Sequence, residues 1–359
     1  MGNHNNLWDN FGGKNPDIYD KRQEMESLGN TAREFYKLVQ TKNALEVYRK
    51  AYNMAELIGD TEKMGEYKYW IVDCLYSLSR YKESLVEIFE LLQIKPILPL
   101  HYFYGLIKQF YLAINIPIEL SKIQSVVQDC YDFNRQNGLN GESMILSNKS
   151  SLASLRFEYE YALKLSMEAL SKYDKNGGFY NIYVHYEDVL YCFKDLKQLS
   201  PLKEWLTKLQ NVDTVYNISK QCVVLKYKAE IALLENKPET AYEYAKRNFR
   251  ICQENDMYIL KATILAIRTG IAVGHLDSLY AYLGNLFRLR NSESKHDQYN
   301  IHKTFGEYHA ARYKRDKNVK DFKSAKKCFE RALKIGSDID QLLECNGRQN
   351  EILLLISEL

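Results

Sequence analysis

The chain has 359 residues, of which 46% are hydrophobic, and its 49 Lys and Arg nearly balance its 46 Asp and Glu, giving a formal net charge of +3. This balance excludes a chain that is basic throughout and binds nucleic acid by overall charge. No window approaches the roughly 18 apolar residues that span a bilayer, and the seven widely spaced cysteines contain no C-x-x-C pair, so we expect a cytoplasmic protein with reduced thiols and no membrane contact.

The N-terminal segment 1–19 is polar and rich in Asn and Gly, and we expect it to be a disordered or extended lead-in. Apolar and small residues then recur at helical spacing in two groups, which predict two short helices packed against each other. They are Leu28, Ala32 and Phe35, followed by Ala44, Tyr48 and Ala51.

This pattern repeats along the chain. A small or apolar residue opens the second helix of each predicted pair at intervals of about 40 residues, a period that indicates a helical solenoid. The eight positions are Ala44, Leu85, Ile123, Ala162, Leu202, Ala241, Leu279 and Ala325. No Pro/Gly/Ser-rich linker interrupts the series, so we expect one elongated, all-α domain over 20–337.

Prolines support this division. Pro96 and Pro99 follow a helix predicted over 81–93, and Pro201 occupies a position where the first turn of a helix tolerates proline. Pro238 follows Lys237 in the predicted turn inside the sixth pair. These prolines, which interrupt helices, therefore fall between the predicted helices or at their ends.

The last segment, 338–359, is predicted to be a helix that caps the end of the solenoid. It contains five consecutive apolar residues, more than a helix with one buried face needs. Two alternatives follow: the helix is buried on two faces, or it docks on another molecule or on a second copy of the chain. The five residues are Ile352, Leu353, Leu354, Leu355 and Ile356.

The spacing resembles the tetratricopeptide repeat (TPR) family. Units such as Ala44-x3-Tyr48-x2-Ala51 and Ala325-x3-Phe329-x2-Ala332 carry the small and aromatic residues of that family at matching intervals. The family repeat is 34 residues long, so the units here are longer. The resemblance implies a right-handed α-solenoid of about eight antiparallel helix pairs; irregular pairs of the HEAT or armadillo type are the alternative.

The resemblance also implies where a ligand binds. In TPR proteins the first helix of each pair lines a concave groove that holds a peptide or protein segment. Aromatic and cationic side chains at the matching positions suit an acidic peptide or a peptide carboxylate. The positions are Arg33, Tyr36, Tyr67, Trp70, Lys108, Tyr191, Lys226, Lys261 and Arg268.

The sequence contains no motif for nucleotide, serine-hydrolase or zinc chemistry. The seven histidines form no cluster with cysteine or carboxylates at metal-ligand spacing. We therefore expect no catalytic residue, no metal and no cofactor, and a protein that is not an enzyme.

Lys and Arg outnumber Asp and Glu in segment 303–334. Such a surface attracts phosphate backbones or an acidic protein, whereas a solvated outer face is the plainer interpretation. The candidate basic patch comprises Arg312, Lys314, Arg315, Lys323, Lys326 and Lys327.

These observations favour a non-enzymatic scaffold or adaptor that binds a protein or peptide, within a regulatory or multi-protein assembly. One alternative resembles the bacterial peptide-sensing regulators built from slightly long TPR units. Because the first repeat is predicted to begin near residue 20, such a receptor would lack a DNA-binding domain of its own. The other alternative is a complex subunit with a basic surface facing nucleic acid.

Overall fold

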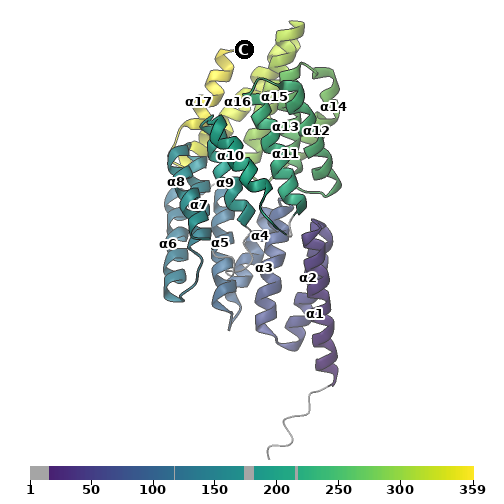
Figure 1. The fold of residues 1–359 in the computed structure, drawn as a ribbon, viewed down its shortest axis with the longest axis vertical. Coiled ribbons are helices and arrows are strands. Elements are labelled where there is room, and N and C mark those ends of the chain that lie inside the picture. The colour runs from purple at the N-terminus through teal and green to yellow at the C-terminus, as the bar shows by residue number, and fades with distance from the viewer. Residues whose placement is uncertain (1–15, 117, 174–181, 215–216) are drawn as a thin grey trace, which may run out of the picture.

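The computed structural model describes residues 16–116, 118–173, 182–214 and 217–359. In these residues every secondary-structure element is helical: seventeen α-helices and two short 3₁₀-helices form an elongated right-handed coil of helix pairs (Figure 1). Residues 1–15 of the expected lead-in lie outside the described residues, and the first helix already begins at Pro16. No described helix has the length and apolar character that crossing a bilayer requires.

The helices form eight consecutive pairs followed by one further helix. The first four pairs are α1 (Pro16–Lys37) with α2 (Thr41–Ile58), α3 (Thr61–Ser77) with α4 (Tyr81–Gln93), α5 (Pro99–Asn115) with α6 (Leu120–Gln136), and α7 (Glu142–Leu155) with α8 (Tyr159–Ser171). The next three are α9 (Ile182–Asp195) with α10 (Leu199–Gln210), α11 (Asn217–Leu234) with α12 (Pro238–Glu254), and α13 (Ile259–Val273) with η1 (Leu276–Leu279) and α14 (Tyr280–Arg288). After η2 (Leu289–Asn291) come α15 (Lys295–Asp316) with α16 (Val319–Leu342), and finally α17 (Gly347–Ser357).

The predicted repeat is confirmed. Seven of the eight residues expected to open the second helices are completely buried, and Leu85 is half-buried. Small residues at these points let paired helices approach closely. A second regularity lies in the turns, because six pairs place a non-glycine residue with positive φ two positions before the second helix. These residues are Val39, Ser79, Phe157, Lys197, Asn236 and Lys317.

The first helix of a pair is the inner one. In α3 every residue from Gly65 to Leu75 is buried, so this helix is surrounded by protein on all sides. Helix α2 buries Ala44, Tyr48, Ala51 and Ala55 along one face and leaves its other face in water. The second helices therefore form the outer layer.

The C-terminal boundary expected at 338 falls within helix α16. Helix α16 continues to Leu342, and the chain turns at Glu344, where φ is 53°, before α17 begins at Gly347. The carboxylate of Asp340 accepts hydrogen bonds from Arg348 Nη1 and from the backbone N–H of Gln349, both at 2.9 Å. This buried contact ties the start of α17 to the end of α16, a tertiary interaction that the apolar pattern does not reveal.

The coil closes on itself between pairs far apart in sequence. Val39, 6% exposed in the turn between α1 and α2, belongs to an apolar cluster with Phe249, Cys252 and Met257 near the turn between α12 and α13. Beside it, Lys42 forms an ion pair with Asp256. We call this contact the seam; in Figure 1 it lies where the purple α2 meets the green helices.

Two further contacts extend the closure. The backbone N–H of Lys82, at the start of α4, donates to Glu293 Oε2 at 2.8 Å. At the other end, the guanidinium of Arg348 in α17 lies 5.3 Å from the ring centroid of Phe157, in the turn between α7 and α8. Both contacts join segments that are far apart in sequence.

Candidate ligand-binding surface

Charged and polar side chains connect the inner helices of neighbouring pairs. We call this series the inner ladder; each contact joins residues about one repeat apart in sequence. The contacts are Arg33 with Glu66 (2.8 Å), Asp73 with Lys108, Ser147 with Asp188, Glu187 with Lys226 (3.1 Å), Glu230 with Arg268 (3.3 Å), and Lys303 with Glu351. The six contacts occur between α1 and α17, and they join α1 to α3, α3 to α5, α7 to α9, α9 to α11, α11 to α13 and α15 to α17.

Lys261 stands out on the inner ladder, because its exposed ammonium group forms no ion pair with any described residue. Its neighbour Lys226 is paired with Glu187. Burial of the surrounding surface lowers the pKa of Lys261, and the like charge of Lys226 lowers it further. Lys261 is therefore exposed to water, and its pKa lies below the usual value of a lysine.

Carboxylates on α9 lie near both lysines. Burial acts to raise the pKa of Glu187, but Lys226 and Lys261 outweigh it, so its pKa is lowered and the group is ionised at neutral pH. Burial raises the pKa of Asp188 to about 7, so this group is only partly ionised. Asp297 of α15 is a third carboxylate that acts on Lys261.

Tyrosines surround these lysines. The Lys226 ammonium lies 4.7 Å from the ring centroid of Tyr227 and 6.0 Å from that of Tyr191. The Lys261 ammonium lies 6.0 Å from the ring of Tyr258, which is 44% exposed and adopts a left-handed backbone with φ of 48°. Such rings offer stacking surface and hydroxyl groups to a ligand.

The opposite wall comes from the first three pairs. Asp73 in α3 accepts a hydrogen bond from the Tyr36 hydroxyl and pairs with Lys108 of α5. The nearby Tyr183 raises the pKa of Tyr258 most strongly, and Asp73 is among the groups that raise it further. The charge on α3 thus acts on the tyrosine that precedes α13, although these helices belong to pairs far apart in sequence.

Seven of the nine residues expected to contact a ligand lie on this surface: Arg33, Tyr36, Lys108, Tyr191, Lys226, Lys261 and Arg268. The structure places the other two elsewhere. Tyr67 is 2% exposed and directs its hydroxyl to the carbonyl of Met25, and Trp70 is 4% exposed and stacks on Tyr48 at 5.8 Å. Both fill the space between the first two pairs, because α3 is buried on every side.

Sequence reasoning missed the acidic half of the ladder. Asp73, Glu187 and Glu230 precede their cationic partners by 35, 39 and 38 residues. A search for opposite charges separated by one repeat would have found all three. The exposed Tyr258 carries no comparable signal, because its position depends on the turn between α12 and α13.

The expected basic patch is in part neutralised. Arg315 forms two hydrogen bonds with Asp277, at 2.8 and 3.0 Å, and Arg312 lies 3.5 Å from the carboxylate of Asp321. The other four cations, Lys314, Lys323, Lys326 and Lys327, are exposed at the end of α15 and along α16. In the apolar run of α17, Ile352 is buried, while Leu353 and Leu354 are 46% and 60% exposed.

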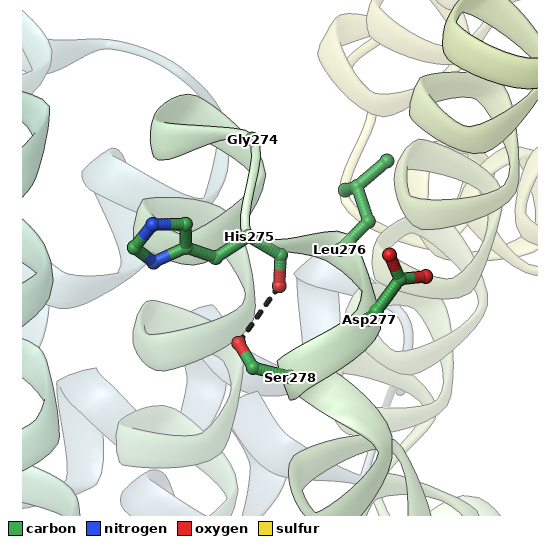
Figure 2. A pocket seen from close by; sticks show the side chains of 5 residues that line it. All are labelled: Gly274, His275, Leu276, Asp277 and Ser278. Atoms are coloured by element: carbon green, nitrogen blue, oxygen red, sulfur yellow. Dashed lines mark hydrogen bonds between the residues drawn. The ribbon is translucent and has the colours of Figure 1, made fainter.

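Two small recesses are found, and the second borders the inner ladder, because its lining residue Glu307 lies 4.0 Å from Lys303. One, of about 420 Å³, is formed by the turn from Gly274 to Ser278, where the Ser278 hydroxyl donates to the carbonyl of His275 at 2.8 Å (Figure 2). The other, of about 220 Å³, lies beside Glu307 and the C-terminal Leu359. The first draws all its lining from one short segment, and no group of three potential metal ligands occurs among the described residues.

Comparison with known proteins identifies the fold. No protein-family model and no curated protein matches the chain. Among solved structures, Rap protein complexed with competence and sporulation factor superposes with a TM-score of 0.58 and 12% identity, covering 94% of this chain and 97% of its own. PilW, a type IV pilus biogenesis factor, superposes with a TM-score of 0.40 and 15% identity over 64% of this chain and 93% of its own. The chain has the fold of a TPR-type helical-repeat solenoid.

Proposed function

We propose that this protein is a non-enzymatic scaffold of the cytoplasm that binds a peptide or an extended protein segment along the inner ladder. One observation carries the proposal: the inner helices present their charges and tyrosines on a single surface, with exposed Lys261 and Arg268 among them. A solenoid needs apolar contacts between its helices, whereas a charged row along its inner face adds little to folding stability.

The ladder suits the chemistry of a peptide. An extended segment brings backbone donors and acceptors, two charged termini and side chains of either sign, and a surface with alternating charges offers partners to all of them. The Rap protein, whose fold spans nearly the whole of this chain, was crystallised in complex with competence and sporulation factor. By that likeness we propose that the inner surface here also holds a ligand.

A regulatory receptor is the second candidate, and the seam favours it. A ligand on the inner ladder lies between helices from both sides of the closing contact around Val39 and Met257. Binding there can tighten or loosen the coil and so change the outer surface that a partner protein meets.

The test uses immobilised protein and a pool of random heptapeptides, with mass spectrometry of the peptides retained. The inner variant is Glu230→Gln combined with Arg268→Gln, which removes both charges of one contact and leaves neither partner unpaired. The control is Lys326→Ala with Lys327→Ala on the exposed face of α16.

We expect wild type and the α16 control to enrich the same peptides and the inner variant to lose them. The proposal fails if wild type enriches no peptides, or if the inner variant enriches the same set as wild type.

A further inference from the structure

We propose that Cys222 of α11 and Cys252 of α12 are a reversible oxidation site, at which hydrogen peroxide converts two thiols into a disulfide beside the seam. The inference goes beyond the proposed function and does not depend on it. It assigns a chemical modification to the sixth helix pair and gives that modification a consequence for the contact that closes the coil.

The two thiols touch inside the protein. The Sγ atoms of Cys222 and Cys252 lie 3.7 Å apart, and the two residues are 3% and 1% exposed. Both thiols are free, and in the part of the chain that the structure describes no other two cysteines share a hydrogen bond. The sulfur atoms of a disulfide are about 2.05 Å apart, so an approach of about 1.7 Å joins the two.

Their place in the pair makes the approach effective. Cys222 lies near the start of α11 and Cys252 near the end of α12, and a short turn joins the other ends of these two antiparallel helices. A disulfide therefore closes the open end of the pair. Such a bond restricts the unfolded chain between the two cysteines, so it stabilises both helices.

The hydrogen bond between the thiols divides their roles. Cys252 donates its S–H to Cys222, and this bond lowers the pKa of Cys222, although burial and Glu187 act to raise it. The same bond raises the pKa of Cys252. Because the thiolate is the nucleophile in thiol oxidation, Cys222 reacts first. It lies one helical turn before Lys226, so the inner ladder is the side from which a small oxidant reaches it.

The reaction is balanced by hydrogen peroxide alone. The Cys222 thiolate attacks one peroxide oxygen, the O–O bond breaks and hydroxide leaves, which gives a sulfenic acid. The Cys252 sulfur then attacks the Cys222 sulfur and displaces a second hydroxide. The two thiol protons convert both hydroxides to water, and the two sulfur atoms have lost two electrons to the peroxide. A dithiol reverses the change by thiol–disulfide exchange and is itself oxidised, so in a reducing cytoplasm the bridge is transient.

The bridge forms beside the seam. Cys222 and Cys252 belong to the buried cluster that contains Val39 and Met257. The backbone N–H of Met257 donates to the carbonyl of Cys252 at 2.9 Å, which couples the positions of these two residues. When Cys252 is drawn toward Cys222, Met257 shifts relative to Val39, because a packed cluster has little space to absorb the movement. Oxidation within one pair thus changes a contact between pairs far apart in sequence.

The experiment treats reduced full-length protein with hydrogen peroxide, in buffer and in guanidinium chloride. Remaining thiols are blocked with N-ethylmaleimide, and linked peptides are identified by mass spectrometry without reduction. The proteins are wild type, Cys252→Ser, whose hydroxyl can still donate to Cys222, and the matched control Cys328→Ser on α16. Circular dichroism and thermal unfolding establish that each variant is folded in buffer.

We expect folded wild type and Cys328→Ser to give one dominant link, between Cys222 and Cys252, which dithiothreitol removes. The unfolded chain should give a mixture of links. In Cys252→Ser the reaction should stop at a sulfenic acid on Cys222, which dimedone traps. Hydrogen exchange in oxidised wild type should be slower in α11 and α12 than in reduced wild type, and its rate should change in segment 38–41, which contains Val39.

Three results overturn the inference. If peroxide leaves Cys222 and Cys252 unlinked at concentrations that oxidise the half-buried Cys328 and Cys345, the pair is not an oxidation site. If folded and unfolded protein give the same mixture of links, the contact in the folded state does not direct the reaction. If the link forms and exchange in segment 38–41 stays unchanged, the bridge does not act on the seam.

Discussion

Gly306 tests how tightly the inner and outer helices of one pair pack. It lies within α15, and a Cβ added there would stand 2.5 Å from Cδ1 and 3.0 Å from Cγ of Phe329 in α16. Carbon atoms in ordinary contact are about 3.5 to 4.0 Å apart. The Phe329 ring is 1% exposed and packs in a buried apolar cluster, so it must shift to make room for the added methyl group.

The magnitude of the effect follows from two opposing contributions. Overpacking a close-packed core costs about 1 to 3 kcal/mol, while replacing glycine by alanine inside a helix returns about 1 kcal/mol. We therefore expect Gly306→Ala to destabilise the last pair by up to about 2 kcal/mol. The matched substitution Gly284→Ala, in α14, places its Cβ in open space and should stabilise the protein by about 0.5 to 1 kcal/mol.

Hydrogen exchange measured by mass spectrometry is the suitable assay, because stability in a solenoid is distributed among neighbouring repeats and need not unfold in one step. Gly306→Ala should speed exchange in peptides from α15 and α16, and Gly284→Ala should slow exchange in α14. Equal protection in Gly306→Ala and wild type would refute the close approach of these helices. A loss of protection in both variants would show that glycine is required for another reason.

Two groups on α9 should give the stability opposite dependences on pH. Burial raises the pKa of Asp188 to about 7 from its ordinary value of 3.8, so the folded state holds this proton more tightly and wild type loses stability as pH rises from about 4 to 7. Asp188→Asn removes that loss, so its melting temperature should exceed that of wild type by more at pH 8 than at pH 5. An equal difference at the two pH values would contradict a raised pKa of Asp188. Burial lowers the pKa of His185 to about 4 from 6.5, so its contribution is lost as pH falls through this window. His185→Leu should reduce the fall in melting temperature between pH 6.5 and 4. If the melting temperature of the variant falls as steeply as that of wild type, His185 does not cause this pH dependence.

The sequence determined the repeat. Small residues such as Ala44 and Ala325 allow the two helices of one pair to pack closely. These contacts lie within a single pair, and their spacing recurs in every unit. Even where the aromatic pattern is weak, the expected positions Ile123, Leu202 and Leu279 are completely buried. Local packing and turn geometry are encoded within about 40 residues, which is why a single sequence reveals them.

Part of the candidate surface was also predictable. The cations Lys108, Lys226 and Arg268 lie on the inner ladder as the TPR resemblance implied, because the first helix of each pair faces inward in this fold. Tyr67 and Trp70 do not, since α3 is enclosed on all sides and its large aromatic side chains fill the core. Repeat positions counted along the sequence cannot tell a side chain on the ligand-facing surface from one in the core when the helix has no continuous polar face.

Only the tertiary structure decided which distant units meet. The contact of Val39 with the sixth and seventh pairs depends on the rotation accumulated over the intervening repeats, and a small change in each step would separate the two walls. Lys261 became distinctive for the same reason, because the curvature of the whole coil determines which carboxylates reach it. The repeat is a local property that the sequence specifies, whereas the seam and its unpaired cation are products of superhelical geometry.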